Sequence, residues 1–98
     1  MIIHTEDVVL VGSEIVTRRH KIAGAVTVDG APAERVVMVM NRRNFTYIGA
    51  TLSDPTTGDW EITGLQEYQE GTLLVIAMDT TGAYNAEVAD YVSQVATT

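Results

Sequence analysis

Cysteine is absent from this 98-residue chain, so it has neither a disulfide framework nor a thiolate metal site. Histidine is almost as scarce, because His4 and His20 stand alone without the spacing of a zinc-ligating pair. No serine lies in a Gly-x-Ser-x-Gly context, and the eight glycines occur singly rather than in a phosphate-binding loop. The sequence therefore predicts no catalytic, cofactor-binding or metal-binding residue, and a protein that is not an enzyme.

Long apolar runs are also missing, since no stretch approaches the roughly 18–20 residues that span a bilayer. The first residues, MIIHTEDVVLVG, carry acids where a signal peptide would carry lysines. We therefore expect no secretory signal, synthesis in the cytoplasm and no membrane partner.

Basic residues are absent from the second half of the chain. All six Lys and Arg residues precede position 44, and eight acidic residues follow it. The net charge of −7 argues against nucleic acid as the main partner. The uneven layout is interpreted either as a solvated acidic surface or as a molecule whose basic end docks on an acidic neighbour, and high salt would weaken such docking.

Two carboxylates, Asp54 and Asp59, flank the turn DPTTGD. Such a pair could bind calcium or serve as an acid and a base. The loop lacks the alternating acidic ligands of an EF-hand, and acids are common in turns because they accept hydrogen bonds from backbone N–H groups. We interpret both as turn residues and expect no metal-dependent stability.

From Lys21 to Asp79 the chain consists of short, β-branched apolar runs separated by turn residues such as Asp29-Gly30. A strand spacing near ten residues indicates a sandwich or barrel. We predict an all-β fold, a single β-sandwich of about seven or eight antiparallel strands with little helix. The expected strands are 21–28, 35–41, 45–53, 60–63, 72–79, 84–89 and 91–95. The expected core residues are Ile22, Val26, Val37, Val39, Ile48, Leu52, Trp60, Ile62, Leu74 and Ile76.

The run RVVMVMN at 35–41 is apolar on both faces. This is expected of a central strand that is covered on both sides or that contacts a partner.

The first twenty residues precede the recognisable sandwich, which we assign to 21–98. Residues 1–20 contain two short apolar runs and are interpreted either as the first hairpin of the domain or as an arm that adds a strand to another subunit. An arm would bury apolar residues that a lone domain leaves wet. The candidate interface residues are Ile2, Ile3, Val8, Val9, Leu10, Val11, Arg18, Arg19, Arg42 and Arg43.

Four motifs follow one another in the sandwich region. They are Ile22-x-Gly24-x-Val26-x-x-Asp29-Gly30-x-Pro32-Ala33, then Arg35-Val36-Val37-Met38-Val39, then Thr51-x-Ser53-Asp54-x-x-x-Gly58-x-Trp60-x-Ile62-x-Gly64-Leu65, then Leu74-Val75-Ile76-Ala77. In this order they resemble the carboxypeptidase regulatory-like, or transthyretin-like, family of Ig-like β-sandwiches. The resemblance covers Lys21 to Asp79 and implies the fold, but says little about function because the family serves as an add-on module in many proteins.

The residues after this region add a second resemblance. The pattern Asp79-x-x-Gly82-x-Tyr84-Asn85-Ala86-x-Val88-x-Asp90 is similar to small structural proteins of tailed bacteriophages. It implies a virion protein made in the host cytoplasm, either a capsid decoration (cement) protein or a tail component. Its partners would be the major capsid or tail protein and, as a homo-oligomer, itself. The alternative is a carbohydrate-binding or host-surface-binding module.

Overall fold

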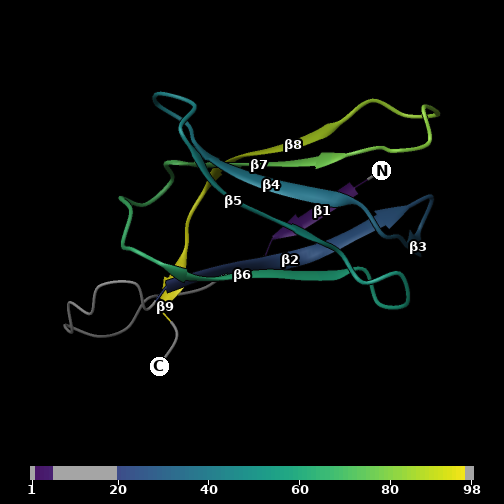
Figure 1. Cartoon of the computed structure of the whole chain (residues 1–98), viewed down its shortest axis with the longest axis horizontal. Helices are drawn as coiled ribbons and strands as arrows, with labels where there is room; N and C mark the ends of the chain where they lie inside the picture. Colours follow the sequence, from purple (N-terminus) through teal and green to yellow (C-terminus); the bar gives the residue numbers. More distant parts are fainter. Residues whose placement is uncertain (1, 6–19, 97–98) are drawn as a thin grey trace.

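The computed structural model describes residues 2–5 and 20–96, which form two antiparallel sheets packed face to face (Figure 1). The described residues contain no helix, so the predicted all-β sandwich is confirmed. Seven strands have four or more residues, and two further strands have only two. The strands are β1 (Ile2–Thr5), β2 (His20–Val28), β3 (Ala31–Pro32), β4 (Val36–Asn41), β5 (Tyr47–Leu52), β6 (Asp59–Leu65), β7 (Leu73–Met78), β8 (Glu87–Val92) and β9 (Val95–Ala96).

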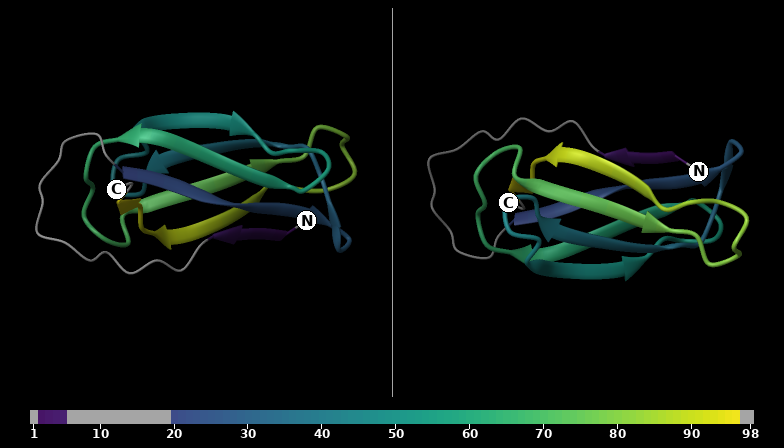
Figure 2. Two further views of the ribbon diagram at one scale, coloured as in Figure 1. Left: turned by 90° about the horizontal axis from the view of Figure 1, so that it is seen from below. Right: turned by 90° about the horizontal axis from the view of Figure 1, so that it is seen from above.

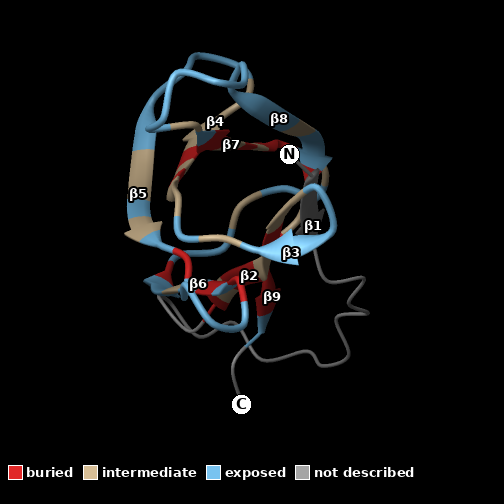
Figure 3. Ribbon diagram, turned by 90° about the vertical axis from the view of Figure 1, so that its right-hand side faces the viewer, coloured by how far each residue is buried: buried red, intermediate tan, exposed pale blue. Residues whose placement is uncertain are grey.

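The first sheet is built around β2, which pairs with β6 and β3 along one side and with β9 and β1 along the other. The second sheet has the order β5-β4-β7-β8. Figure 2 shows the two layers from below and from above. At the two open sides of the sandwich, β5 lies beside β6 and β1 lies beside β8, as the view along the strands in Figure 3 shows.

The core lies between the sheets and follows the alternation of each strand. Val26, Val37, Val39 and Val75 have no exposed surface, and Trp60 is 4% exposed. Of the ten predicted core residues, five are buried and Ile48 and Ile62 pack partly buried against them. The five buried ones are Ile22, Val26, Val37, Val39 and Trp60.

The predicted face of β7 was wrong, because Leu73, Val75 and Ala77 point into the core rather than Leu74 and Ile76. Every residue of β7 is apolar, so alternation gives no sign of which face is buried.

Leu52 is a second error, since it is 58% exposed. A bulge in β5 explains it. Val39 pairs with Gly49 and Met40 with Tyr47, which leaves Ile48 without a partner. The extra residue shifts the alternation by one, so Ile48 packs inward while Leu52 emerges on the outside.

The last predicted strands also differ from the structure. Residues 84–89 and 91–95 were predicted as two strands, but β8 runs continuously from Glu87 to Val92 and the residues around Tyr84 form a loop. The short strand β3 was predicted as loop. Both differences lie in stretches of sequence where residues typical of turns stand among residues typical of strands.

The N-terminal strand β1 pairs with β2 of the same chain, with Ile2 opposite Thr27 and Thr5 opposite Gly24. Residues 2–5 therefore form a strand within the sandwich of their own chain. The remainder of the predicted arm, residues 6–19, lies outside the described residues, as does Met1. No helix in the described part of the chain is long and apolar enough to cross a membrane.

Candidate functional site: an apolar outer sheet face

The second sheet has an outward face made mostly of uncharged side chains, with the charged pair Arg42 and Asp90 at one corner. Because β4 and β7 bury one set of alternate residues, the other set points away from the core. Strand pairing carries the same face across to β5 and β8. The members of this outer apolar face are Val36, Met38, Met40, Tyr47, Ala50, Leu52, Leu74, Ile76, Met78, Val88 and Tyr91.

The central row of the outer apolar face runs across all four strands. Met38 pairs with Ala50 on one side and with Ile76 on the other, and Ile76 pairs with Val88. These side chains lie close enough to contact one another, so the face is a continuous surface rather than scattered apolar residues.

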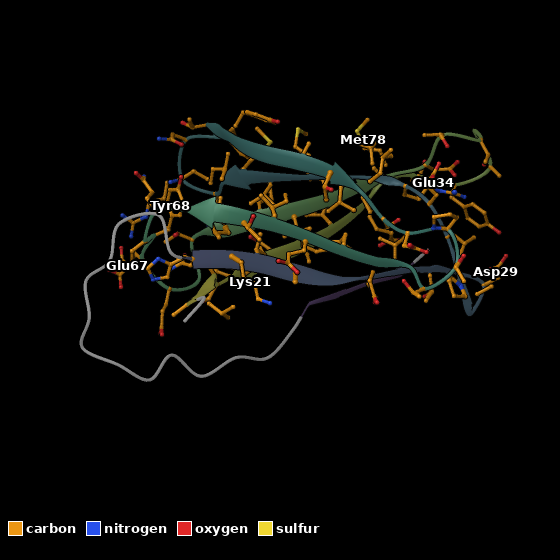
Figure 4. The ribbon with its side chains drawn as sticks, turned by 60° about the horizontal axis from the view of Figure 1, so that its bottom comes forward. Lys21, Asp29, Glu34, Glu67, Tyr68 and Met78 are labelled. Atoms are coloured by element: carbon orange, nitrogen blue, oxygen red, sulfur yellow. The ribbon has the colours of Figure 1, made fainter. Side chains whose placement is uncertain are left out.

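Solvent reaches much of this face. Leu52 is 58% exposed, Val88 55% and Met78 45%, and Figure 4 shows Met78 pointing away from the sandwich. Five of the eleven residues are 45–66% exposed, so the face presents on the order of several hundred Å² to solvent, comparable with the largest apolar patch of a typical monomer at about 300–600 Å². An apolar patch of this size is typical of an interaction surface.

The outward face of the first sheet has a different composition. It carries the polar side chains Thr27, Asp59, Glu61 and Thr63, and Lys21 forms a 4.0 Å ion pair with Glu61. The two outer faces of the sandwich are thus unlike, because charged side chains lie within the outer face of the first sheet, whereas Arg42 and Asp90 lie at one corner of the other.

Arg42, Asp90 and Tyr91 form one corner of the outer apolar face. A bulge in β8 places Asp90 and Tyr91 together opposite Leu74, with Tyr91 at a φ of 54°. The Arg42 Nε donates to Asp90 at 2.6 Å, and its Nη2 donates to the Tyr91 hydroxyl at 2.7 Å. The hydrogen bond between Arg42 and Asp90 lowers the pKa of Asp90 and raises the pKa of Arg42. The guanidinium also lies 3.9 Å from the centre of the Tyr91 ring, within the range of a cation–π contact.

The loop between β4 and β5 adds further aromatic surface at the same end of the sheet. Phe45 is 64% exposed and has a φ of 57°, held by its N–H donating to the Asn41 carbonyl at 2.8 Å. Arg43 donates from Nη2 to Gln69 at 2.8 Å. Arginine and aromatic residues are the types enriched at binding hot spots, which favours this end as the anchor of an interface.

The loop between β7 and β8 is held at the other end of the sheet by Asp79. Its carboxylate accepts from the Tyr84 N–H at 3.0 Å and from the Thr81 hydroxyl, and lies 3.3 Å from the Arg35 Nε. The Tyr84 hydroxyl in turn donates to Asp29 at 2.5 Å, which ties this loop to the β2–β3 turn. The hydrogen bond from Tyr84 is the main reason that the pKa of Asp79 falls to about 2, with Thr81 and Arg35 acting in the same direction.

We predict that Asp79 makes stability fall with acid. Its folded pKa of about 2 lies below the unfolded value of about 3.9, so its contribution is complete above pH 4 and disappears as pH falls from about 4 to 2. Denaturant unfolding of the wild type and of Asp79→Asn measures this. The variant should be less stable at pH 7, and the gap should close near pH 2. A gap that stays constant with pH would show that the charge of Asp79 is not what stabilises the loop.

A second surface feature is an open cleft of about 700 Å³ beside the β5–β6 turn, lined by that turn, by the start of β6 and by Ala23 and Gly24 of β2. The carboxylate of Asp54 already accepts from the Thr56 and Thr57 N–H groups at 2.6 and 3.0 Å. It therefore acts as the turn residue that the sequence predicted. Within the described ranges, no three His, Asp or Glu side chains are grouped to hold a metal ion.

The structure places the predicted interface residues in different situations. Arg42 lies at the corner of the outer apolar face, and Arg43 lies in the adjoining loop. Arg42 is engaged with Asp90 of its own chain, so it is not a free cation for an acidic neighbour. Ile2 and Ile3 belong to β1, whose backbone pairs with β2. Val8, Val9, Leu10, Val11, Arg18 and Arg19 lie outside the described residues.

The outer apolar face itself was not predicted as a site. The sequence did contain one sign of it, because the run 35–41 is apolar on both faces. This run contains β4, which lies at the centre of the outer apolar face. Comparison of the chain with known protein families, with curated proteins and with solved structures finds no match.

Proposed function

We propose that the protein is a non-enzymatic structural component of a bacteriophage virion that docks on neighbouring subunits through its outer apolar face. The observation that carries this proposal is the mostly uncharged, exposed face of the second sheet. A face of this kind is suited to adhesion and offers no reacting group. The similarity of 79–90 to phage structural proteins supports the virion setting, as a capsid decoration protein or a tail component.

The energetics of the face fit such a role. Removing apolar surface from water favours association by roughly 25 cal/mol per Å². Association itself costs roughly 4–15 kcal/mol, and ordering of side chains such as the three methionines adds to that cost. Only the surplus appears as affinity, and an apolar face has fewer polar groups to desolvate than a polar face of equal size.

Comparison of particles made with and without the gene tests this function. We expect the protein in purified virions by mass spectrometry, and an added density by electron microscopy that is missing from particles without the gene. Val88→Lys places a charge on the outer apolar face and should prevent incorporation. Thr63→Lys places the same charge on the outer face of the other sheet and should not. A wild-type protein that never occurs in purified particles would refute the virion role.

Exposed aromatic residues favour a second candidate function, a carbohydrate-binding module. Phe45, Tyr47 and Tyr91 are each more than 60% exposed. Sugar rings stack on such side chains, and a glycan array tests for this binding. Specific glycan binding that is lost on Tyr91→Ala, in a protein absent from virions, would favour this function over the first.

A further inference from the structure

We propose that the occupant of the outer apolar face is a second copy of this chain, packed sheet against sheet about a two-fold axis. This inference rests on the face being an interaction surface, as the proposed function has it, but not on the virion setting.

The size of the face matches what a dimer needs. A stable, specific interface buries about 800 Å² on each partner, a little over half of it apolar, and the several hundred Å² of the outer apolar face are on the order of that apolar share. In a two-fold pair the same patch is used twice, so no second apolar surface has to exist elsewhere on the chain.

The charges on the chain restrict where a second copy can dock. The chain carries a net charge of −7, which would repel a copy at most orientations. The outer apolar face contributes nothing to that repulsion, because none of its eleven residues is charged. At its corner, Arg42 and Asp90 lie 2.6 Å apart and cancel, so the corner presents no net charge to the other copy. A basic partner would be drawn to the acidic loops rather than to this face.

The side chains of the face suit sheet-on-sheet packing. Two such sheets pack about 10 Å apart with interdigitating side chains. Met38, Met40 and Met78 are unbranched and can fill irregular gaps between two identical surfaces. Val36, Ile76 and Val88 supply the rigid β-branched surface against which they pack.

Sedimentation equilibrium of the full chain tests the dimer. The monomer mass is 10.6 kDa, and we expect twice that mass at micromolar concentration. Val88→Lys and Leu52→Lys lie on opposite edge strands of the face, and each should raise the dissociation constant at least about 100-fold, since each charge occurs twice in the pair. Thr63→Lys should leave the dissociation constant unchanged. Circular dichroism and thermal unfolding of all three variants show that they remain folded.

Two results overturn the inference. One is a chain that stays monomeric at several hundred micromolar. The other is a dimer that both face variants leave as tight as the wild type. A monomer that still joins particles through the face would refute the second copy and leave the proposed function standing. A dimer that both face variants weaken, in a protein that never joins particles, would support the second copy and refute the virion role.

Discussion

Replacing Trp60 with alanine is expected to lower the free energy of unfolding by about 3–5 kcal/mol. Trp60 is 4% exposed and belongs to the cluster of buried residues between the two sheets. Its removal would leave a cavity that the rigid sheets can fill only in part. Since domains of this size are stable by about 5–15 kcal/mol, chemical denaturation should show a large shift of the midpoint.

Trp60→Phe is the matched control for this change. The indole N–H of Trp60 is buried and has no hydrogen-bond partner among the described residues. Replacement by phenylalanine therefore reduces the packed volume without breaking a hydrogen bond. The loss should be well below that of alanine. A loss under about 1 kcal/mol for Trp60→Ala would place the side chain at the surface and contradict the described core.

Replacing Gly58 with alanine is expected to cost about 2–5 kcal/mol. Gly58 has a φ of 79°, and an added Cβ would lie closer to the Val26 carbonyl oxygen than van der Waals contact allows. The left-handed conformation costs a non-glycine residue about 1–2 kcal/mol, and relief of the backbone clash adds about 1–3 kcal/mol. The clash cannot be relieved cheaply because the Val26 N–H donates to the Gly58 carbonyl at 2.9 Å.

Gly30→Ala separates the two contributions. Gly30 has nearly the same φ, 82°, but a Cβ there meets nothing within 4 Å. Its replacement should cost only the conformational part, about 1–2 kcal/mol. Equal losses of stability at the two positions would show that the contact between Gly58 and β2 does not constrain the turn.

Much of the fold was predictable, because a strand that alternates apolar and polar residues shows which of its two faces is buried. Ile22 and Val26 alternate with small or polar residues in β2, and their burial followed from that pattern. The same rule failed in β7, where Leu73 and Leu74 are equally apolar. It failed again in β5, because a bulge at Ile48 cannot be read from residue types alone.

The failures in β7 and β5 concern the candidate site. Leu52, Leu74 and Ile76 were predicted as core and instead form part of the outer apolar face. A sequence pattern that is apolar on both sides does not show which face is buried in the core or what contacts the other face. Strand pairing supplied that information, because it aligned separate two-sided runs into one surface.

The corner of the site was predicted only in part. The basic cluster Arg42-Arg43 was selected from the charge layout and does lie beside the outer apolar face. Its partners were not predictable, because Asp90 and Tyr91 are almost fifty residues away and meet Arg42 only through the bulge in β8.

The central claim is that the outer apolar face is covered when the protein is assembled. The chain contains no cysteine, so Val88→Cys introduces a single thiol in the middle row of that face, and Thr63→Cys introduces one on the other sheet. The most direct measurement is the rate of thiol alkylation in purified particles and in free protein diluted until it is monomeric. We predict that the Val88→Cys thiol reacts at least about ten-fold more slowly in particles, while the Thr63→Cys thiol is unaffected. Equal rates for Val88→Cys in the two states would contradict the claim.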